Sequence, residues 1–478
     1  MANIAKGFKI VIIGSGMGGS FLAVYLSRLG CEIEIYERRP DIRRESGQEG
    51  RSINMTLATR GLIALEEVGL LDAVMAETLP LKGRMIHDLD GTRTFQPYGK
   101  GGGEVIHSIK RDKLNVALMN AAHDLPNVKM FFNKRCTSID KQNGLVNLQD
   151  ERTGETQCVK ADIIVGADGA FSTIRQQMQR GVRAHYKQDF LDWGYKELCI
   201  PPGPRNTHQM EGDALHIWPR GDHMLLAMPN ADGSFTCTCI LPFEGESSFA
   251  STKTPDDIVR LFSTWFPDAL PLLPNLVNEF TTNKIAEMIT THTHPWYYKD
   301  RVVLVGDACH AVVPFYGLGM NAAFEDCAVL SDCLSRCTGD LEATFAEYQS
   351  LRKPHTDVLA GLSKQNFIEL REKVESPLFV ARKKVEVVLN RVLPWAWVPL
   401  YSMMSHTTLP YAEALRRSEK QNRVGRLLGL DVVMLSAAGA LVAWSYGKKI
   451  RKKFKRKDEL KPQFPVALPD PLGVDRQE

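Results

Sequence analysis

The chain lacks a strong charge excess, a paired cysteine motif and a long uninterrupted hydrophobic run. Its 478 residues carry a formal net charge of only +3, so the composition gives no case for binding nucleic acid. Ten cysteines are spread along the chain without a CxxC pair, which favours reduced, buried thiols over a disulfide framework or a metal site. Only a few polar residues precede the first apolar segment, and we therefore expect neither a signal peptide nor secretion.

The strongest pattern is a strand–turn–helix–strand sequence near the N-terminus. Residues 10–13 are apolar and partly β-branched and predict a buried strand, and apolar residues at helical spacing then predict a helix that ends at Gly30. A second strand, over residues 32–36, alternates charged and apolar side chains and leads to Glu37. This is the order of a βαβ unit that binds a dinucleotide.

The glycine-rich turn of this unit has separate tasks for its three glycines. Gly14 permits the tight turn, Gly16 lets the backbone approach a pyrophosphate, and Gly19 lets the helix pack against the strand. The helix N-terminus offers free N–H groups and a positive dipole to the phosphates. Glu37 is placed to accept a hydrogen bond from a ribose hydroxyl, which argues against a 2′-phosphate there and leaves FAD and NAD as alternatives.

Two later turns bring acidic residues to the same edge of the predicted sheet. Asp168 follows a strand predicted over residues 163–165, and Asp307 follows one over residues 302–305. Because ligands of open α/β sheets bind at the carboxyl ends of the strands, both acids can reach the nucleotide. A helix that starts near Met320 would point its positive end at the same ligand.

The middle of the chain has a different pattern. Residues 214–243 contain three strand-like runs separated by Arg-Gly-Asp and Asp-Gly turns and predict an antiparallel sheet that walls a second ligand's site. Helical patterns dominate residues 254–295 and again 341–426. Arg84 and Tyr98 flank a predicted hairpin, where they are either ordinary surface and packing residues or two side chains that face one space.

The apolar segment 427–447 has basic residues on both sides. Its uncharged stretch is slightly shorter than the roughly 20 residues that a spanning helix needs, and the positive-inside rule does not decide its orientation. We expect a membrane anchor, with a helix that lies on anionic lipid as the alternative.

Three motifs in this order, GSGMGG with its terminal Glu37, GADGAFSTIR and LVGDACHAVVPFYGLGMNAAFED, resemble the FAD-dependent aromatic hydroxylases, the single-component class A flavoprotein monooxygenases. The words GRSIN, GRMIH, PYG, QNFIELR and VPLYSM are similar, along nearly the whole chain, to the branch that acts on L-kynurenine. The resemblance implies an α/β fold with a Rossmann-like FAD-binding domain, an inserted antiparallel-sheet substrate domain, a C-terminal helical region and a membrane-anchor helix. The implied segments are 1–180 and 286–340 for the FAD-binding domain, 181–285 for the substrate sheet, 341–426 for the helical region, 427–447 for the anchor and 448–478 for a basic, then disordered tail.

The resemblance also implies the ligands and the residues that bind them. FAD is the resident cofactor, NADPH is a transient reductant, and O2 and L-kynurenine are the substrates, with 3-hydroxykynurenine as the product of a step in tryptophan degradation towards NAD. The implied FAD-binding residues are Gly14, Gly16, Met17, Gly19, Glu37, Arg38, Arg39, Arg111, Cys136, Asp168, Asp307, Met320 and Asn321. The implied substrate-binding residues are Arg84, Tyr98, Asn366, Glu369 and Tyr401. Arg84 and Tyr98 are expected to hold the amino-acid carboxylate; no side chain is expected to act as an acid–base catalyst, and no metal is expected.

One departure from the family pattern keeps alternatives open. Leu318 stands where the family usually has glutamine, in the loop PF-x-GQGMN, which puts a hydrogen bond from this position in doubt. The alternatives are a sister hydroxylase with another substrate and a membrane-tethered flavoprotein scaffold that has lost efficient hydroxylation. The resemblance implies a location at the mitochondrial outer membrane, with the body facing the cytosol.

Overall fold

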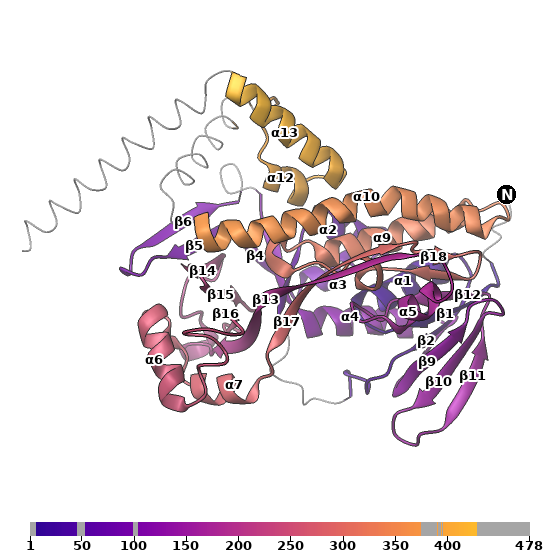
Figure 1. The fold of residues 1–478 in the computed structure, drawn as a ribbon, viewed down its shortest axis with the longest axis horizontal. Helices are drawn as coiled ribbons and strands as arrows, with labels where there is room; N and C mark the ends of the chain where they lie inside the picture. The colour runs from indigo at the N-terminus through magenta and orange to yellow at the C-terminus, as the bar shows by residue number, and fades with distance from the viewer. Residues whose placement is uncertain are drawn as a thin grey trace, which may run out of the picture.

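The fold combines a parallel sheet with a larger, mainly antiparallel one, and helices cover both (Figure 1). The computed structural model describes residues 6–44, 53–98, 104–373, 390, 393 and 395–427. The helices in chain order are α1 Met17–Arg28, α2 Thr59–Glu67, α3 Leu71–Met75, α4 Arg111–His123, α5 Thr173–Gln179, α6 Pro255–Trp265, α7 Leu276–Thr282, α8 Asp307–His310, α9 Gly319–Ser335, α10 Leu341–Ile368, α12 Leu400–Ser405 and α13 Tyr411–Leu427.

The parallel sheet has the strand order β18-β19-β12-β1-β2-β8. All neighbouring pairs are parallel except β18 with β19 at one edge. The strands are β1 Lys9–Ile13, β2 Glu32–Tyr36, β8 Val128–Phe131, β12 Ile163–Gly166, β18 Tyr297–Tyr298 and β19 Val302–Leu304. The predicted βαβ unit and the two later strands are therefore confirmed, and their carboxyl ends share one edge.

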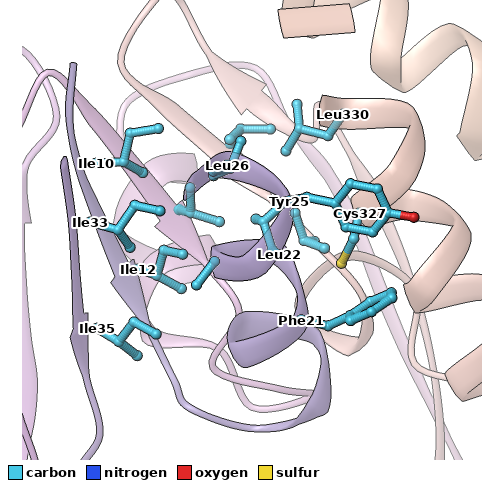
Figure 2. Close-up of a cluster of buried hydrophobic side chains, with 14 of the residues drawn as sticks. Ile10, Ile12, Phe21, Leu22, Tyr25, Leu26, Ile33, Ile35, Cys327 and Leu330 are labelled. Carbon is cyan, nitrogen blue, oxygen red and sulfur yellow. The ribbon is translucent and has the colours of Figure 1, made fainter. Parts of the chain in front are cut away.

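Helix α1 is buried between this sheet and α9 (Figure 2). Leu22 and Leu26 face the isoleucines of β1 and β2, whereas Phe21 and Tyr25 face α9, where Cys327 lies beside them. The Cys327 thiol also donates to the Gly18 carbonyl oxygen at 3.4 Å. Apolar contacts on two sides fix the helix axis, so the N-terminus of α1 is held at the glycine-rich turn.

The larger sheet has the order β17-β13-β16-β15-β14-β5-β6. Its strands are β5 Gly83–His87, β6 Arg93–Pro97, β13 His185–Ile200, β14 Ala214–Arg220, β15 His223–Pro229, β16 Phe235–Pro242 and β17 Ala286–His294. The three predicted strands are present as β14, β15 and β16. The helical prediction for residues 254–295 is right for α6 and α7 but wrong for β17, which pairs with β13. The sheet thus extends beyond the expected segment 181–285.

Two smaller sheets and the C-terminal helices complete the described part of the chain. One small sheet contains β3 Asn54–Leu57, β4 Leu79–Leu81 and β7 Ile106–Lys110, and the other contains β9 Lys134–Asp140, β10 Leu145–Asp150 and β11 Thr156–Lys160, which the sequence analysis did not predict. Helices α12 and α13 lie beside α10 (Figure 1). No helix within the described ranges is long and apolar enough to cross a membrane, and the predicted anchor lies outside those ranges from residue 428 onward.

Candidate active site

The glycine-rich turn between β1 and α1 leaves open space in front of the helix. Gly14 has a φ of +104°, and a Cβ on it would lie 2.5 Å from the Ala167 carbonyl oxygen. A Cβ on Gly19 would lie 2.0 Å from the Gly14 carbonyl oxygen, whereas a Cβ on Gly16 would meet nothing within 4 Å. The first and third glycines therefore serve the turn and the packing, and the second faces space that phosphates can occupy at the α1 N-terminus, where Met17 begins the helix.

Glu37 lies at the carboxyl end of β2 with its side chain already oriented. Its carboxylate accepts hydrogen bonds from the Ser15 amide and from the Arg39 amide, both at 3.0 Å. An open cavity of about 530 Å³ adjoins this end of the turn. The residues that line it are Arg38, Arg39, Pro40, Asn133, Arg135, Glu151 and Arg152. A fixed acid beside a predominantly positive cavity suits the ribose and phosphates of a nucleotide, so Glu37, Arg38 and Arg39 fit the adenosine end of FAD.

Cys136, Asp168 and Arg111 have less direct environments. Burial raises the pKa of the Cys136 thiol to about 12, and the nearby Asp168 adds to the shift, so this cysteine is an inert packing residue. The Asp168 carboxylate accepts from the hydroxyl of Ser172, the N-cap residue of α5, and from the Ile174 amide at 3.1 Å, and thereby holds the turn against the start of the helix. Arg111 is exposed as the first residue of α4. A cofactor contact of the Asp168 side chain stays a prediction, because the turn itself uses both carboxylate oxygens.

The return segment brings Asp307 and the α9 N-terminus to the same edge of the sheet. Asp307 follows Gly306, whose φ is +62°, and its side chain is exposed, as a ligand-binding acid requires. Met320 is buried in the first turn of α9. Both groups therefore remain compatible with the predicted FAD site.

The side chain of Asn321 is fully engaged by the protein itself. The residue is 0% exposed, and its amide oxygen accepts from the Ala58 amide at 2.8 Å. Its amide nitrogen donates to the Thr56 carbonyl oxygen at 2.8 Å and to the Gly317 carbonyl oxygen at 3.2 Å. The side chain therefore clamps the loop before α9 to β3, and only the main chain of Asn321 is left for a cofactor.

A buried ion-pair network lies behind Asp307. Asp326 accepts from His310 and from Arg352, and Arg352 also pairs with Glu325 at 2.6 Å. Burial lowers the pKa of His310, but the Asp326 carboxylate outweighs burial and raises it overall. Cys309, His310 and Asp326 bring three ligand-type atoms together, but a guanidinium already occupies the carboxylate. The network therefore joins α8, α9 and α10 and is a poor site for a cation.

Arg84 lies between two tyrosines from distant parts of the chain. Its guanidinium carbon lies 5.4 Å from the Tyr98 ring centroid and 5.1 Å from the Tyr401 ring centroid, and these two rings stack at 5.4 Å. Burial alone would lower the pKa of Arg84, but the two tyrosine hydroxyls raise it, so the guanidinium stays charged. Its Nε is buried without a hydrogen-bond partner, and no described carboxylate pairs with it. A charged, partly buried guanidinium that has no carboxylate partner among the described residues is a site for a carboxylate ligand.

Asn366 and Glu369 lie at the C-terminal end of α10. The Asn366 amide donates to the Phe315 carbonyl oxygen at 2.7 Å, and Glu369 accepts from Gln365 at 3.2 Å. Both are partly buried and one helical turn apart, as the sequence predicted. Asn366 therefore ties α10 to the loop that precedes α9.

Tyr316, which the sequence did not single out, belongs to the short helical turn η4 Pro314–Tyr316. Its ring stacks on Tyr401 at 5.7 Å. An aromatic residue beside a glycine, just before the α9 helix, was the available signal. Leu318, by contrast, is 2% exposed and packs in an apolar cluster with residues such as Leu359 and Met404. Its side chain serves packing between the loop and the C-terminal helices.

Comparisons with known proteins identify the family and the fold. A family model described as FAD binding domain matches residues 8–359. A protein from Salinispora tropica named kynurenine 3-monooxygenase is 46% identical over 93% of this chain and 98% of its own, and one of the same name from Dictyostelium discoideum is 40% identical over 85% of this chain and 89% of its own.

Two solved structures share the fold. A tetrameric form of 2-methyl-3-hydroxypyridine-5-carboxylic acid oxygenase has a TM-score of 0.63 at 23% identity and covers 78% of this chain and 95% of its own. Pseudomonas aeruginosa PqsL in complex with 2-aminobenzoylacetate has a TM-score of 0.62 at 19% identity and covers 77% of this chain and 97% of its own.

Proposed function

The chain belongs to the kynurenine 3-monooxygenase family of FAD-binding enzymes, and on that premise we propose which residues hold its substrate, what reduces its flavin and where it works. It is an FAD-dependent monooxygenase of the kynurenine pathway that hydroxylates kynurenine. The FAD-binding α/β fold of aromatic hydroxylases supports the same conclusion.

The guanidinium of Arg84, which has no carboxylate partner among the described residues, carries the assignment of the substrate site. Kynurenine is an amino acid, and its carboxylate can form a charge-assisted, bidentate pair with Arg84 while the Tyr98 hydroxyl donates to the same group. The stacked Tyr98 and Tyr401 rings form an apolar wall that excludes water from this pair. Asn366 positions the Phe315 loop, and Glu369 is an acceptor suited to the substrate's amino group.

The oxygen chemistry belongs to the cofactor. When bound, FAD takes electrons from NADPH, activates O2 and supplies one oxygen atom to the ring carbon ortho to the aryl amine. The protein's task is to hold the ring at a fixed place and to keep water away, which needs binding and shape but no acid–base pair. Gly16, Glu37 and Asp307 would hold the cofactor, because they combine open space, an oriented carboxylate and an exposed acid at one sheet edge.

NADPH is the proposed reductant, and it binds transiently without a second glycine-rich dinucleotide-binding motif. The sequence has one glycine fingerprint that ends on an acid, and Glu37 would repel a 2′-phosphate at that position. NADPH therefore reaches the flavin from outside the FAD site. Flavin reduction under anaerobic conditions should be faster with NADPH than with NADH; equal rates would overturn this choice of reductant.

We also propose that residues 427–447 anchor the protein in the mitochondrial outer membrane, with the body in the cytosol. The support is the apolar segment between basic flanks, which follows α13 directly. Truncation after Arg426 should move the protein from the membrane fraction to the soluble fraction of a cell that expresses the full chain. A truncated protein that still sediments with mitochondria would contradict the anchor.

Product analysis tests the function itself. Purified full-length protein with FAD, NADPH, O2 and kynurenine should consume NADPH faster when kynurenine is present and should yield 3-hydroxykynurenine in nearly equal amount. NADPH consumption that yields only hydrogen peroxide would support a degraded enzyme, and stimulation by a different aromatic acid alone would support a sister hydroxylase. Either result would overturn the assignment.

A further inference from the structure

We propose that the Tyr316 hydroxyl contacts the substrate and donates a hydrogen bond to the ketone oxygen of kynurenine. The inference rests on the proposed function, because it concerns the same site. It also answers the question that Leu318 raises: the loop before α9 supplies its polar group to the site from position 316 and not from position 318.

Leu318 is not available to the substrate. Only 2% of its surface is exposed, and its side chain belongs to an apolar cluster built by the loop together with α10, α12 and α13. A glutamine with the same orientation would bury its amide among leucine and methionine side chains, where an unpaired amide is costly. The leucine at position 318 is therefore consistent with its surroundings, and the loss of glutamine there is not by itself a loss of function.

Tyr316 is held in place on both sides. Its ring stacks on Tyr401, with centroids 5.7 Å apart and planes inclined by 29°. The next residue, Gly317, has a φ of +72°, and its carbonyl oxygen accepts from the Thr56 hydroxyl at 2.8 Å and from the Asn321 amide at 3.2 Å. The clamp restricts the backbone and the stack restricts the ring, so the hydroxyl has a defined position.

The Tyr316 hydroxyl is free to meet a ligand. It has no hydrogen-bond partner in the described part of the chain, and it is not among the unpartnered polar atoms that are fully shielded from solvent. The Tyr411 hydroxyl in the same apolar cluster differs, because it has no hydrogen-bond partner and is fully shielded from solvent. Burial, with help from Tyr401, raises the pKa of Tyr316, so the phenol keeps its proton and can donate.

The order of the stacked rings indicates which substrate atom Tyr316 meets. Arg84 lies over Tyr98 and Tyr401, the first two rings of the stack, and Tyr316 is the third, on the loop that leads into α9. A kynurenine whose carboxylate pairs with Arg84, and whose chain follows the stacked rings, would pass Tyr401 and reach Tyr316. The ketone is the next polar group along its chain, and a ketone oxygen needs a donor when water is excluded.

Substrate analogues separate this contact from a merely structural role. The Tyr316→Phe variant keeps the stacked ring and should bind kynurenine about tenfold more weakly than the wild type, since one hydrogen bond is lost. It should bind the analogue with a methylene group in place of the ketone as well as the wild type does. Binding is followed by the change in the flavin spectrum during titration, with FAD content measured in each sample.

Two further variants complete the design. Tyr411→Phe removes a hydroxyl that is shielded from solvent and should leave the affinity for kynurenine unchanged. Leu318→Gln should not raise the affinity for kynurenine. A Tyr316→Phe variant that binds kynurenine as tightly as the wild type, or that weakens both ligands equally, would overturn the inference. A wild-type protein that fails to bind or hydroxylate kynurenine would instead overturn the proposed function.

Discussion

At the residue scale, the glycines of the N-terminal turn are needed for two different reasons. Gly19 is required by the protein, because a Cβ there would lie 2.0 Å from the Gly14 carbonyl oxygen. Gly16 is required by the ligand, because a Cβ there meets no protein atom within 4 Å and its φ of −64° suits any residue. The same motif thus contains one packing requirement and one binding requirement.

This difference predicts opposite outcomes for two alanine variants. Gly16→Ala should fold with an unchanged melting temperature in the FAD-free form but bind FAD roughly tenfold more weakly, because the methyl group occupies the space of a phosphate. Gly19→Ala should lower the melting temperature of the FAD-free form by several degrees, since helix and strand must move apart. Thermal melts and FAD titrations measure both effects. A Gly16→Ala variant with a lower melting temperature and unchanged FAD affinity would contradict the assignment of Gly16 to ligand binding.

Some residue roles could be read from local sequence and others could not. Glu37 follows a strand, and the structure holds it at that strand's end with two backbone hydrogen bonds. The roles of Asn321 and Leu318 depend on partners far away in the chain: Asn321 bonds to Ala58, and Leu318 packs against helices that begin beyond residue 340. The motif predicts that Asn321 lies at the cofactor site, but it cannot show which distant residues the side chain contacts.

At the element scale, strands β5 and β14 are joined by a buried histidine pair. His216 donates from Nε2 to the Glu211 carbonyl oxygen at 2.9 Å, so its Nδ1 accepts from His87 at 2.9 Å when the ring is neutral. His87 in turn faces the Asp268 carboxylate at 2.9 Å, and Trp218 donates to the same carboxylate. Burial favours a neutral His216, because a charge on this ring would be removed from water.

The histidine pair predicts a loss of stability in acid. Burial lowers the pKa of His216 from 6.5 to about 4. The contribution to stability is therefore fully present above pH 6.5, declines as the pH falls towards 4, and totals about 3 kcal/mol. Urea unfolding at pH 7.5 and at pH 5 should show a smaller difference for His216→Gln than for the wild type. The exposed His123→Gln is the control, and equal pH dependence in all three proteins would contradict the prediction.

The elements that the sequence predicted worst are those defined by distant pairing. β17 was expected to be helical, yet its residues pair with β13 in a register that joins His185 to His294. Local sequence patterns cannot show which distant strand a segment pairs with. The helical patterns of the neighbouring α6 and α7 favoured the prediction of a helix for β17 as well. The βαβ unit was predicted correctly because its strand, turn and helix are contiguous and each carries its own signal.

At the scale of the whole molecule, the substrate site is assembled from segments that are more than 300 residues apart. Arg84 comes from β5, Tyr98 follows β6, and Tyr401 comes from α12. The larger sheet supplies the first two, and the C-terminal helices supply the third by packing against α10 and the loop before α9. Sequence reasoning named these residues through their resemblance to a family; only the fold explains why they face one another.

The central claim is that Arg84 holds the substrate carboxylate, and ligand binding to matched variants tests it most directly. Affinities for kynurenine and for its decarboxylated analogue should be measured with the wild type, with Arg84→Ala, and with Arg93→Ala as a control on the exposed neighbouring strand β6. Arg84→Ala should keep its FAD and bind kynurenine about 100-fold more weakly than the wild type does, because a desolvated charge pair is lost. The decarboxylated analogue should bind to Arg84→Ala and to the wild type with equal affinity. Unchanged kynurenine affinity in an FAD-loaded Arg84→Ala protein would contradict the account.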